Sequence, residues 1–252
     1  VIHEQNAVAG MANRWLSRVV DLVLISYPTS RAQFPRARRV VTTGNPIRAE
    51  FLMERKADSG FRLFGLDPRK RTVLIFGGSN GSSDLVEQVL FGTRELSRRE
   101  EVQVLLVTGN ESVADEARQR LARDGIANVV VVPYIEQMAV AFAIADLIVS
   151  RAGATTLAEI TSCGKPAILV PWRGATDDHQ LENARVLERE EACRLASDEI
   201  MVRHELVRLV LDVVKDASAL ARLGQNAHRL GQRQAGSLIL HEIHALVRGA
   251  GA

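Results

Sequence analysis

No hydrophobic run in this 252-residue sequence is long enough to cross a membrane, and only two cysteines are present. Cys163 and Cys193 lie far apart without metal-ligand spacing around them, which argues against a disulfide framework and predicts two buried thiols. The 32 Lys and Arg residues are mixed with 30 Asp and Glu residues rather than gathered in a tract, so no nucleic-acid partner is expected. The hydrophobic content of 46% is typical of a chain that folds around a core.

The central part of the sequence alternates between short apolar runs and longer helical segments. The apolar runs are continuous, which is typical of parallel strands that helices cover on both faces. This order predicts a doubly wound, parallel-sheet α/β domain. The predicted strands are 72–76, 102–108, 129–132, 147–150 and 167–170, and the predicted helices between them are 82–97, 113–124, 137–145 and 156–163.

The segments on either side of this domain are less regular. Apolar spacing predicts a helix over 11–20, with Met11 and Trp15 in the core, followed by short strands at 22–25 and 40–42. Residues 50–70 are charged and broken by glycine and proline, which predicts an irregular linker or domain boundary. Beyond the domain, the sequence predicts a helix at 178–190, an edge strand at 194–196, and helices at 203–215, near Leu220 and at 237–247.

The stretch LIVSRAGATTLAE, residues 147–159, has the features of a ligand site. A strand ends at Ser150, a turn of small residues follows, and Thr155 or Thr156 could cap the next helix. The first N–H groups of that helix and its dipole favour an anion in the turn. Glu159 would repel a phosphate, so we expect it to face an uncharged group beside it, such as the hydroxyls of a ribose. The alternative is an ordinary helix start with no ligand.

Two other loops follow strands of the same predicted sheet. The loop GGSNG, from Gly77 to Gly81, offers glycines that let the backbone approach a phosphate and the hydroxyl of Ser79. It matches neither the Walker pattern nor the dinucleotide fingerprint, and a simple tight turn is the alternative. Residues 171–180 end in side chains with hydrogen-bond donors and acceptors, among them His179 and Gln180, which suit a ligand rich in hydroxyls.

His179 has two further interpretations, as a metal ligand or as a general base. No partnered set of metal ligands accompanies it in the sequence, so we expect no metal. Because the carboxyl ends of parallel strands meet at one edge of a sheet, the three loops together predict a phosphate-bearing nucleotide joined to a polyol. A nucleotide sugar fits this description.

Five motifs occur along the chain: HEQNAVAG (His3 to Gly10), GNPIR (Gly44 to Arg48), GGSNG, RAGATTLAEI (from Arg151) and DDHQLENA (Asp177 to Ala184). With these motifs in this order, the sequence resembles the MurG family. That family transfers N-acetylglucosamine from its UDP donor to undecaprenyl-diphosphate-N-acetylmuramoyl-pentapeptide during peptidoglycan synthesis. The resemblance implies a GT-B architecture, in which two Rossmann-like domains face each other across a cleft.

The resemblance also implies which residues bind the donor, UDP-N-acetylglucosamine. The residues that would hold the ribose and the sugar are Glu159, Gln180, His179 and, from the acceptor side, Asn6. The residues that would hold the diphosphate are Arg48, Ser79, Gly78, Ala154, Thr155 and Thr156.

By the same resemblance, residues 71–234 form the UDP-sugar domain, 1–47 the last part of the acceptor domain, 48–70 the entry to the second domain, and 235–252 a helix that returns toward the acceptor domain. The chain begins at Val1 in what reads as a strand end, so we expect an N-terminal truncation. The truncation would remove the glycine-rich acceptor loop, with its His and the catalytic base. We therefore expect weak donor binding and little transferase activity from this chain.

The implied reaction is an inverting displacement by the 4-hydroxyl of the acceptor, without a metal or another cofactor. The implied location is the cytoplasmic face of the bacterial inner membrane, with peripheral attachment through the missing domain.

Two alternatives to this function stay open. One is another GT-B enzyme, such as a UDP-N-acetylglucosamine 2-epimerase or a glycolipid glycosyltransferase. The other is a nucleotide-sugar-binding half that works only beside a partner chain.

Overall fold

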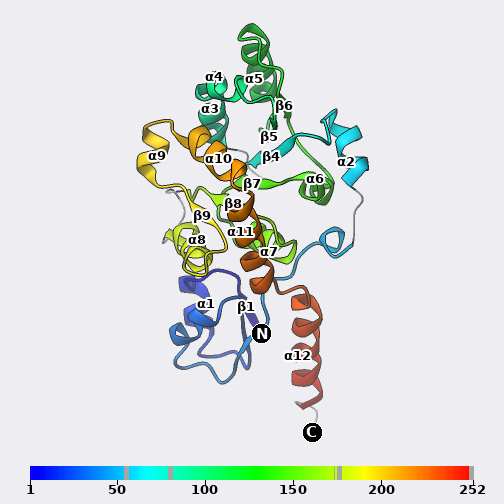
Figure 1. Cartoon of the computed structure of the whole chain (residues 1–252). Helices are drawn as coiled ribbons and strands as arrows, with labels where there is room; N and C mark the ends of the chain where they lie inside the picture. Colours follow the sequence, from blue (N-terminus) through cyan, green and yellow to red (C-terminus); the bar gives the residue numbers. More distant parts are fainter. Residues whose placement is uncertain (54–56, 79–81, 173, 175–177, 250–252) are drawn as a thin grey trace.

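The structure is a computed structural model that describes residues 1–53, 57–78, 82–172, 174 and 178–249. Two separate parallel sheets organise the chain, as Figure 1 shows. The small sheet has the order β1-β2-β3, and the large sheet has the order β6-β5-β4-β7-β8-β9. The strands are β1 (Ile2–Glu4), β2 (Val23–Ile25), β3 (Val40–Thr42), β4 (Arg71–Phe76), β5 (Val102–Val107), β6 (Val129–Val132), β7 (Leu147–Ser150), β8 (Ala167–Leu169) and β9 (Arg194–Leu195).

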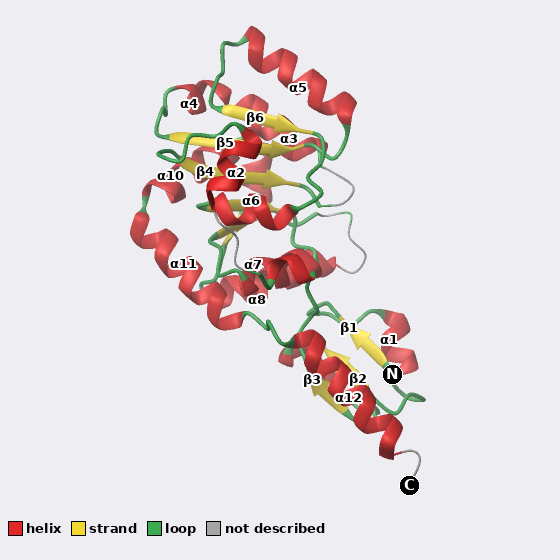
Figure 2. Cartoon of the chain, turned by 90° about the vertical axis from the view of Figure 1, so that its right-hand side faces the viewer, coloured by secondary structure: helices red, strands yellow, loops and turns green. Residues whose placement is uncertain are grey.

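Helices cover both faces of the large sheet, which confirms the predicted doubly wound α/β domain (Figure 2). Along β4, Val73 and Ile75 pack on one face while Leu74 and Phe76 pack on the other. The helices of this part are α2 (Ala57–Phe64), α3 (Ser83–Phe91), α4 (Thr93–Ser97), α5 (Glu111–Arg123), α6 (Met138–Ile144), α7 (Ala154–Ser162), α8 (His179–Arg189), α9 (Asp198–Val202), α10 (Leu206–Lys215) and α11 (Ala217–Leu230).

Glycine explains two differences from the sequence prediction. The segment predicted to be irregular contains α2, in which a side chain on Gly60 would come within 2.7 Å of Ile144 on α6. Close packing against α6 therefore stabilises a helix that intrinsic propensity disfavours. The single helix predicted over 82–97 is divided into α3 and α4 at Gly92, where a side chain would come within 2.4 Å of Val207.

A third difference concerns the helix predicted from residue 203. The structure instead has α9, then a break at His204, whose φ of 55° is left-handed, and then α10. The predicted edge strand is confirmed as β9, which pairs with β8.

The carboxyl ends of three adjacent strands of the large sheet are level with one another. Phe76, the last residue of β4, pairs with Val107 of β5 on one side and with Ser150 of β7 on the other. From β4 the strand order runs outward to β6, and from β7 it runs outward to β9 in the opposite direction. The gap between the ends of β4 and β7 is therefore the switch point at which open α/β sheets bind ligands.

The small sheet carries α1 (Met11–Leu16) and the short 3-10 helix η1 (Pro28–Gln33), while η2 (Ala49–Phe51) follows it along the chain. The prediction that Met11 and Trp15 are core residues is wrong, because they are 68% and 63% exposed. Since α1 packs on the edge strand β1, the described residues give its outer face nothing to pack on. The Trp15 ring instead lies 4.4 Å from the guanidinium carbon of Arg18.

The last helix, α12 (Ala235–Gly249), lies along the small sheet, as Figure 2 shows. An ion pair of 2.6 Å between Arg39, beside β3, and Glu242 joins it to that sheet. The described residues cover its apolar side chains only in part, since Leu240 is 58% and Val247 is 67% exposed. Among the described residues, no helix combines the length and the apolar character needed to cross a membrane.

Candidate functional site

A cleft of about 1010 Å³ opens at the switch point between β4 and β7, and the small-sheet part of the chain forms its far side. Its polar lining comes from loops that follow four strands of the large sheet, from the starts of α7 and α8, and from the loop after β1. The residues that line it are Gly77, Gly78, Ser82, Ser83, Asp84, Thr108, Asn110, Val113, Arg151, Gly153, Ala154, Thr155, Thr156, Trp172, Gln180, Gln5 and Asn6.

The amino end of α7 opens into this cleft. Gly153 is the N-cap residue, in extended conformation, and as a glycine it has no side chain to accept a hydrogen bond there. The predicted capping by Thr155 or Thr156 is therefore wrong. The first N–H groups of α7 have no intrahelical partner, so without a capping side chain they stay available to a ligand. The dipole of the nine-residue helix adds partial positive charge at this end, which favours an anion.

Gly78 lines the cleft on the β4 side. Its φ of 87° lies in the left-handed region, which glycine adopts without strain. A side chain there would meet no atom of the described residues within 4 Å, so the backbone conformation, rather than lack of space, favours glycine. Ser79, in the same loop, and Asp177, in the loop after β8, lie outside the described residues.

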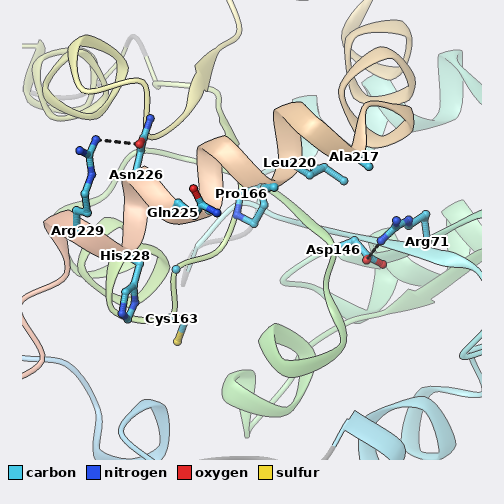
Figure 3. Close-up of a pocket in the computed structure, with 13 residues that line it drawn as sticks. Arg71, Asp146, Cys163, Pro166, Ala217, Leu220, Gln225, Asn226, His228 and Arg229 are labelled. Carbon is cyan, nitrogen blue, oxygen red and sulfur yellow. Dashed lines mark hydrogen bonds and ion pairs between the residues drawn. The ribbon is translucent and has the colours of Figure 1, made fainter.

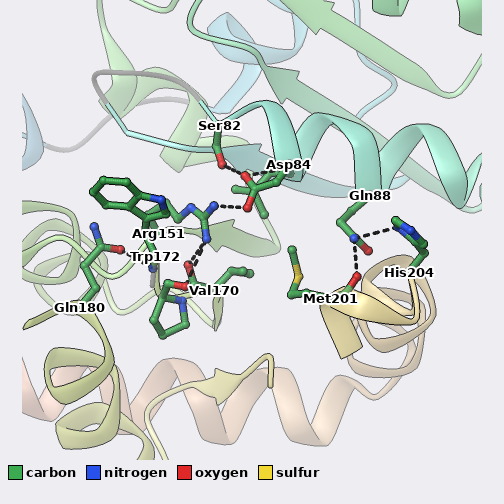
Figure 4. Close-up of polar contacts among 11 residues, drawn as sticks. Ser82, Asp84, Gln88, Arg151, Val170, Trp172, Gln180, Met201 and His204 are labelled. Atoms are coloured by element: carbon green, nitrogen blue, oxygen red, sulfur yellow. Dashed lines mark hydrogen bonds and ion pairs between the residues drawn. The ribbon is translucent and has the colours of Figure 1, made fainter. Parts of the chain in front are cut away.

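Arg151 and Asp84 form a contact that the sequence analysis missed, and Figure 4 shows it at the edge of the cleft. Arg151 Nη1 donates to the carbonyl oxygens of Val170 at 3.0 Å and Pro171 at 3.2 Å, while Nη2 donates to Asp84. The other Asp84 oxygen accepts from Ser82. This network joins the loops after β4, β7 and β8. In the sequence, the sign of this contact is the position of Arg151, a cation directly between an apolar strand and a turn of small residues.

Burial works to raise the pKa of Asp84, but the hydrogen bonds from Ser82 and Arg151 outweigh it and lower the pKa. The Asp84 contribution to stability is therefore present above the ordinary Asp pKa of about 4 and is lost as the pH falls through the lowered value. Replacing Asp84 by Asn should lower the free energy of unfolding by about 0.5–1 kcal/mol at pH 7, because the ion pair is solvent-screened.

Urea unfolding from pH 7 down to about pH 3 tests this expectation, since the difference between wild type and Asp84→Asn should shrink as the pH falls. Asp115→Asn, which alters an exposed ion pair with Arg118 on α5, is the matched control. A difference that does not depend on pH would contradict the assigned role of the Asp84 charge.

Glu159 and Arg48 are paired with each other, and neither is part of the described lining of the cleft. Arg48 Nε donates to Glu159 Oε1 at 2.9 Å and Nη2 donates to Oε2 at 3.3 Å, while Nη1 lies 3.0 Å from Glu50. The Glu159 side chain is 5% exposed and that of Arg48 is 48% exposed. Burial raises the pKa of Glu159, and the hydrogen bonds and charge of Arg48 oppose this rise. Glu159, on α7, is thus a buried carboxylate paired with a half-exposed cation. The Arg48 guanidinium can therefore move out of the ion pair more readily than the carboxylate can.

Asn6 reaches the cleft from the loop after β1, and Asn183 of α8 holds that loop in place. Asn183 is fully buried, and its Nδ2 donates to Asn6 Oδ1 at 3.0 Å and to the Ala152 carbonyl at 3.2 Å. Its Oδ1 accepts from the backbone N–H of Ala7 at 2.8 Å. Glu4 closes the same loop by accepting from the backbone N–H groups of Asn6 and Gly10. The side-chain amide of Asn183 therefore links the small-sheet part of the chain to the turn before α7.

Gln180 lies at the start of α8 and faces the cleft beside Trp172, as Figure 4 shows. Its Oε1 accepts from the backbone N–H of Trp172 at 3.0 Å, which fixes the side chain across the loop after β8. His179 is the first residue of α8 and is half-buried, outside the described lining of the cleft. The residue before it, Asp178, has a left-handed φ of 52°.

A second large groove, of about 850 Å³, lies at the opposite ends of the strands (Figure 3). Arg71 and Asp146, at the starts of β4 and β7, form a 2.7 Å ion pair there, and α11 forms one wall. Burial raises the pKa of Cys163 in this groove, and it raises that of the buried Cys193 to about 12. Both thiols therefore stay protonated and unreactive at neutral pH. The helix start that lines this groove, that of α11, is capped by Asp216, whose side chain accepts from the N–H of Ala219 at 2.9 Å, whereas the start of α7 in the cleft has no such cap.

Within the described residues, no group of three or more His, Cys, Asp and Glu side chains has an arrangement that could hold a metal ion. Two parallel α/β units that face each other across a cleft at the ends of their strands define a protein of the GT-B class. The model of the family described as "Glycosyltransferase family 28 C-terminal domain" matches residues 72–239.

Similarity to known proteins extends beyond this domain. The chain is 34% identical over 257 residues to a protein of Halothermothrix orenii named UDP-N-acetylglucosamine–N-acetylmuramyl-(pentapeptide) pyrophosphoryl-undecaprenol N-acetylglucosamine transferase, covering 99% of this chain and 69% of that one. It is 39% identical to the protein of the same name from Oenococcus oeni, covering 93% of this chain and 63% of that one. It superposes on the crystal structure of Acinetobacter baumannii MurG with a TM-score of 0.76 at 30% identity, covering 97% of this chain and 66% of that one.

The chain belongs to the MurG family of glycosyltransferases. It spans about two thirds of the length of these relatives.

Proposed function

We propose that the chain binds UDP-N-acetylglucosamine in the cleft and serves the transfer of N-acetylglucosamine to the lipid-linked N-acetylmuramoyl-pentapeptide that the names of its relatives specify. The observation that carries this proposal is the uncapped amino end of α7, which opens into the cleft opposite the left-handed Gly78. Together these two elements offer backbone N–H groups from two sides to a diphosphate. Ala154, Thr155 and Thr156 would supply those on the α7 side and Gly78 the one on the β4 side, while the contribution proposed for Ser79 rests on the sequence alone.

Donor binding would exchange the partners of Arg48 and Glu159. The ribose hydroxyls would donate to the Glu159 carboxylate, whose remaining lone pairs the Arg48 contacts leave unused. Arg48, with nearly half of its side chain exposed, would then turn toward the diphosphate and offset its charge. Until the donor arrives, the ion pair keeps a buried carboxylate from being left without a partner.

The sugar would lie between the two units of the chain. Gln180 presents its amide N–H groups from the start of α8, with His179 beside it, and Asn6 faces them from the loop after β1. We propose residues 71–234 as the donor domain, 1–47 as part of the acceptor domain and 48–70 as the connection between them. Residues 235–252 would return to the acceptor domain, which the ion pair between Arg39 and Glu242 supports.

We propose a direct displacement for the chemical step. The 4-hydroxyl oxygen of the acceptor forms a bond to the anomeric carbon, and the bond from that carbon to the UDP oxygen breaks with its electron pair. A base takes the hydroxyl proton, and the configuration at the anomeric carbon inverts to β. The N–H groups of α7 and the Arg48 guanidinium would stabilise the negative charge that develops on UDP.

Because the acceptor carries an undecaprenyl chain, the reaction belongs at a membrane surface, and we propose peripheral attachment at the cytoplasmic face.

Isothermal titration of the chain with UDP-N-acetylglucosamine tests the donor assignment, with ADP-glucose as the control for the nucleoside. Saturable binding of UDP-N-acetylglucosamine and not of ADP-glucose is expected, and equal binding of both would refute the donor assignment.

Incubation with UDP-N-acetylglucosamine alone separates a transferase from an epimerase, since an epimerase converts the donor without an acceptor. Transfer that appears only after a partner chain is added would identify a half-enzyme.

The donor affinity is expected to be independent of divalent metal ions. Because the amino end of α7 and Arg48 would stabilise the diphosphate charge without a metal ion, exchanging Mg²⁺ for EDTA should change the dissociation constant of the donor by less than about twofold. The same titration in the two buffers measures this. A weakening of about tenfold or more in EDTA would show that a metal ion belongs to the donor site.

A further inference from the structure

Trp172, in the loop after β8, is the one aromatic residue among the described residues that line the cleft. It is 54% exposed, so a large part of its indole is open to solvent. Trp15 is exposed as well, but it lies on α1 and does not line the cleft. An indole offers a large apolar surface, and ligand sites combine such surfaces with a few polar groups. The position of Trp172 therefore indicates a surface that a ligand covers.

Two contacts fix the position of Trp172 within its loop. Its backbone N–H donates to Gln180 Oε1 at 3.0 Å, as Figure 4 shows. Gly174 lies against the ring, since a side chain on Gly174 would come within 2.5 Å of the indole. The ring is thus placed by the fold before a ligand enters, which lowers the entropic cost of using it for binding.

The side chains that share the cleft with Trp172 limit the chemistry of its partner. Gln180 lies on the same side of the cleft, and Gln5 and Asn6 line it from the loop after β1. These three neutral amides offer hydrogen-bond donors and acceptors to hydroxyl groups. The face of an indole carries partial negative charge, so it attracts C–H groups and repels a phosphate.

A pyranose ring has both kinds of group that this wall requires, because C–H bonds lie on its faces and hydroxyls surround its rim. A nucleobase could also stack on an indole. It has few groups at its edge, however, whereas three amide side chains suit a ligand with several hydroxyls. The wall formed by Trp172 and the three amides therefore favours a sugar.

We propose that Trp172 is a specificity-determining residue of the cleft, on whose indole face the pyranose ring of the donor sugar stacks. This inference rests on the proposed function, because the donor assigned to the cleft supplies the sugar. Trp172 would strengthen the binding of the sugar and not of the nucleoside diphosphate, which the amino end of α7 and Gly78 would hold. It would thus distinguish the nucleotide sugar from the free nucleotide that remains after transfer.

Isothermal titration of Trp172 variants with UDP-N-acetylglucosamine and with UDP tests this proposal. Trp172→Ala should weaken the binding of UDP-N-acetylglucosamine about three- to tenfold and change that of UDP by less than about twofold. Trp172→Phe keeps an aromatic face and should retain most of the affinity for the nucleotide sugar. Trp172→Leu keeps apolar bulk without that face, so its loss should approach that of Trp172→Ala. Thermal unfolding shows whether each variant is folded.

Fluorescence provides a test that leaves Trp172 intact. The sequence contains two Trp residues, so Trp172 is the only indole in the variant Trp15→Phe. Saturation of this variant with UDP-N-acetylglucosamine should shift the indole emission to shorter wavelength, because the sugar displaces water from the ring. UDP should leave the emission maximum nearly unchanged.

Three results would overturn the proposal. The first is an unchanged affinity for UDP-N-acetylglucosamine in folded Trp172→Ala. The second is an equal weakening of both ligands, which would mean that Trp172 supports the nucleotide or the loop. The third is an emission shift with UDP as large as that with the nucleotide sugar, which would place the uracil on the ring.

Failure of this inference is distinguishable from failure of the proposed function. If the wild-type chain binds UDP-N-acetylglucosamine and Trp172→Ala binds it equally well, the donor assignment stands and the role of Trp172 is wrong. If the wild-type chain binds neither UDP-N-acetylglucosamine nor UDP, the donor assignment is wrong and the stacking role falls with it.

Discussion

Replacing Glu159 by Ala is expected to weaken the binding of UDP-N-acetylglucosamine about ten- to a hundredfold, equivalent to about 1.5–3 kcal/mol. Two ribose hydroxyls would lose a charged acceptor in a site from which water is largely excluded. The fold should survive, because Arg48 keeps its ion pair with Glu50 when Glu159 is removed. Isothermal titration of wild type and variant measures the change.

Two further variants separate the contact to ribose from a general effect of charge. Glu159→Gln keeps the shape and one acceptor oxygen, so its loss of affinity should be smaller than that of Glu159→Ala. Glu111→Ala removes an exposed carboxylate on α5 that pairs with Arg118, and it should leave the affinity unchanged. Unchanged affinity in a folded Glu159→Ala variant would remove Glu159 from the donor site.

Replacing Asn183 by Leu is expected to lower the free energy of unfolding by about 2–4 kcal/mol. The buried N–H of Ala7 and the buried carbonyl of Ala152 would both lose a hydrogen bond that the leucine side chain cannot replace. Donor affinity should fall as well, because Asn6 and the turn before α7 would no longer be held together. Urea unfolding and donor titration of the same preparation measure the two effects.

The control for this change is Asn226→Leu on α11. Asn226 donates one exposed hydrogen bond to the Glu191 carbonyl and accepts another from Arg229, so the loss of both should cost about 1 kcal/mol or less. If Asn183→Leu were no more destabilising than Asn226→Leu, the link between the two units would not depend on Asn183.

The large sheet could be predicted from the sequence because its strands are buried on both faces and form continuous apolar runs. The helix α2 could not, because its stability comes from Gly60 packing against α6, a contact between segments that lie far apart in the sequence. The exposure of Met11 and Trp15 was unpredictable for a similar reason. Periodicity predicts an apolar face, but it does not show whether another element covers that face.

The position of the candidate site was also predictable, because glycine loops and small-residue turns after parallel strands lie at one edge of the sheet. The partners of the charged residues were not. Arg48 and Glu159 are 111 residues apart, and Arg151 and Asp84 are 67 apart, so only the folded chain brings them together. The side-chain amide of Asn45 has no hydrogen-bond partner among the described residues, which is likewise a property of the three-dimensional packing that its sequence motif does not indicate.

The central claim is that the cleft between the two units binds the diphosphate of UDP-N-acetylglucosamine at the amino end of α7. The most direct measurement is a ¹H–¹⁵N titration of the chain with this donor. We predict that the largest amide shifts occur at Gly78 and at Ala154, Thr155 and Thr156, where the N–H groups face the cleft. Shifts concentrated on α11, between Ala217 and Arg229, or no saturable shift at the four cleft residues, would contradict the account.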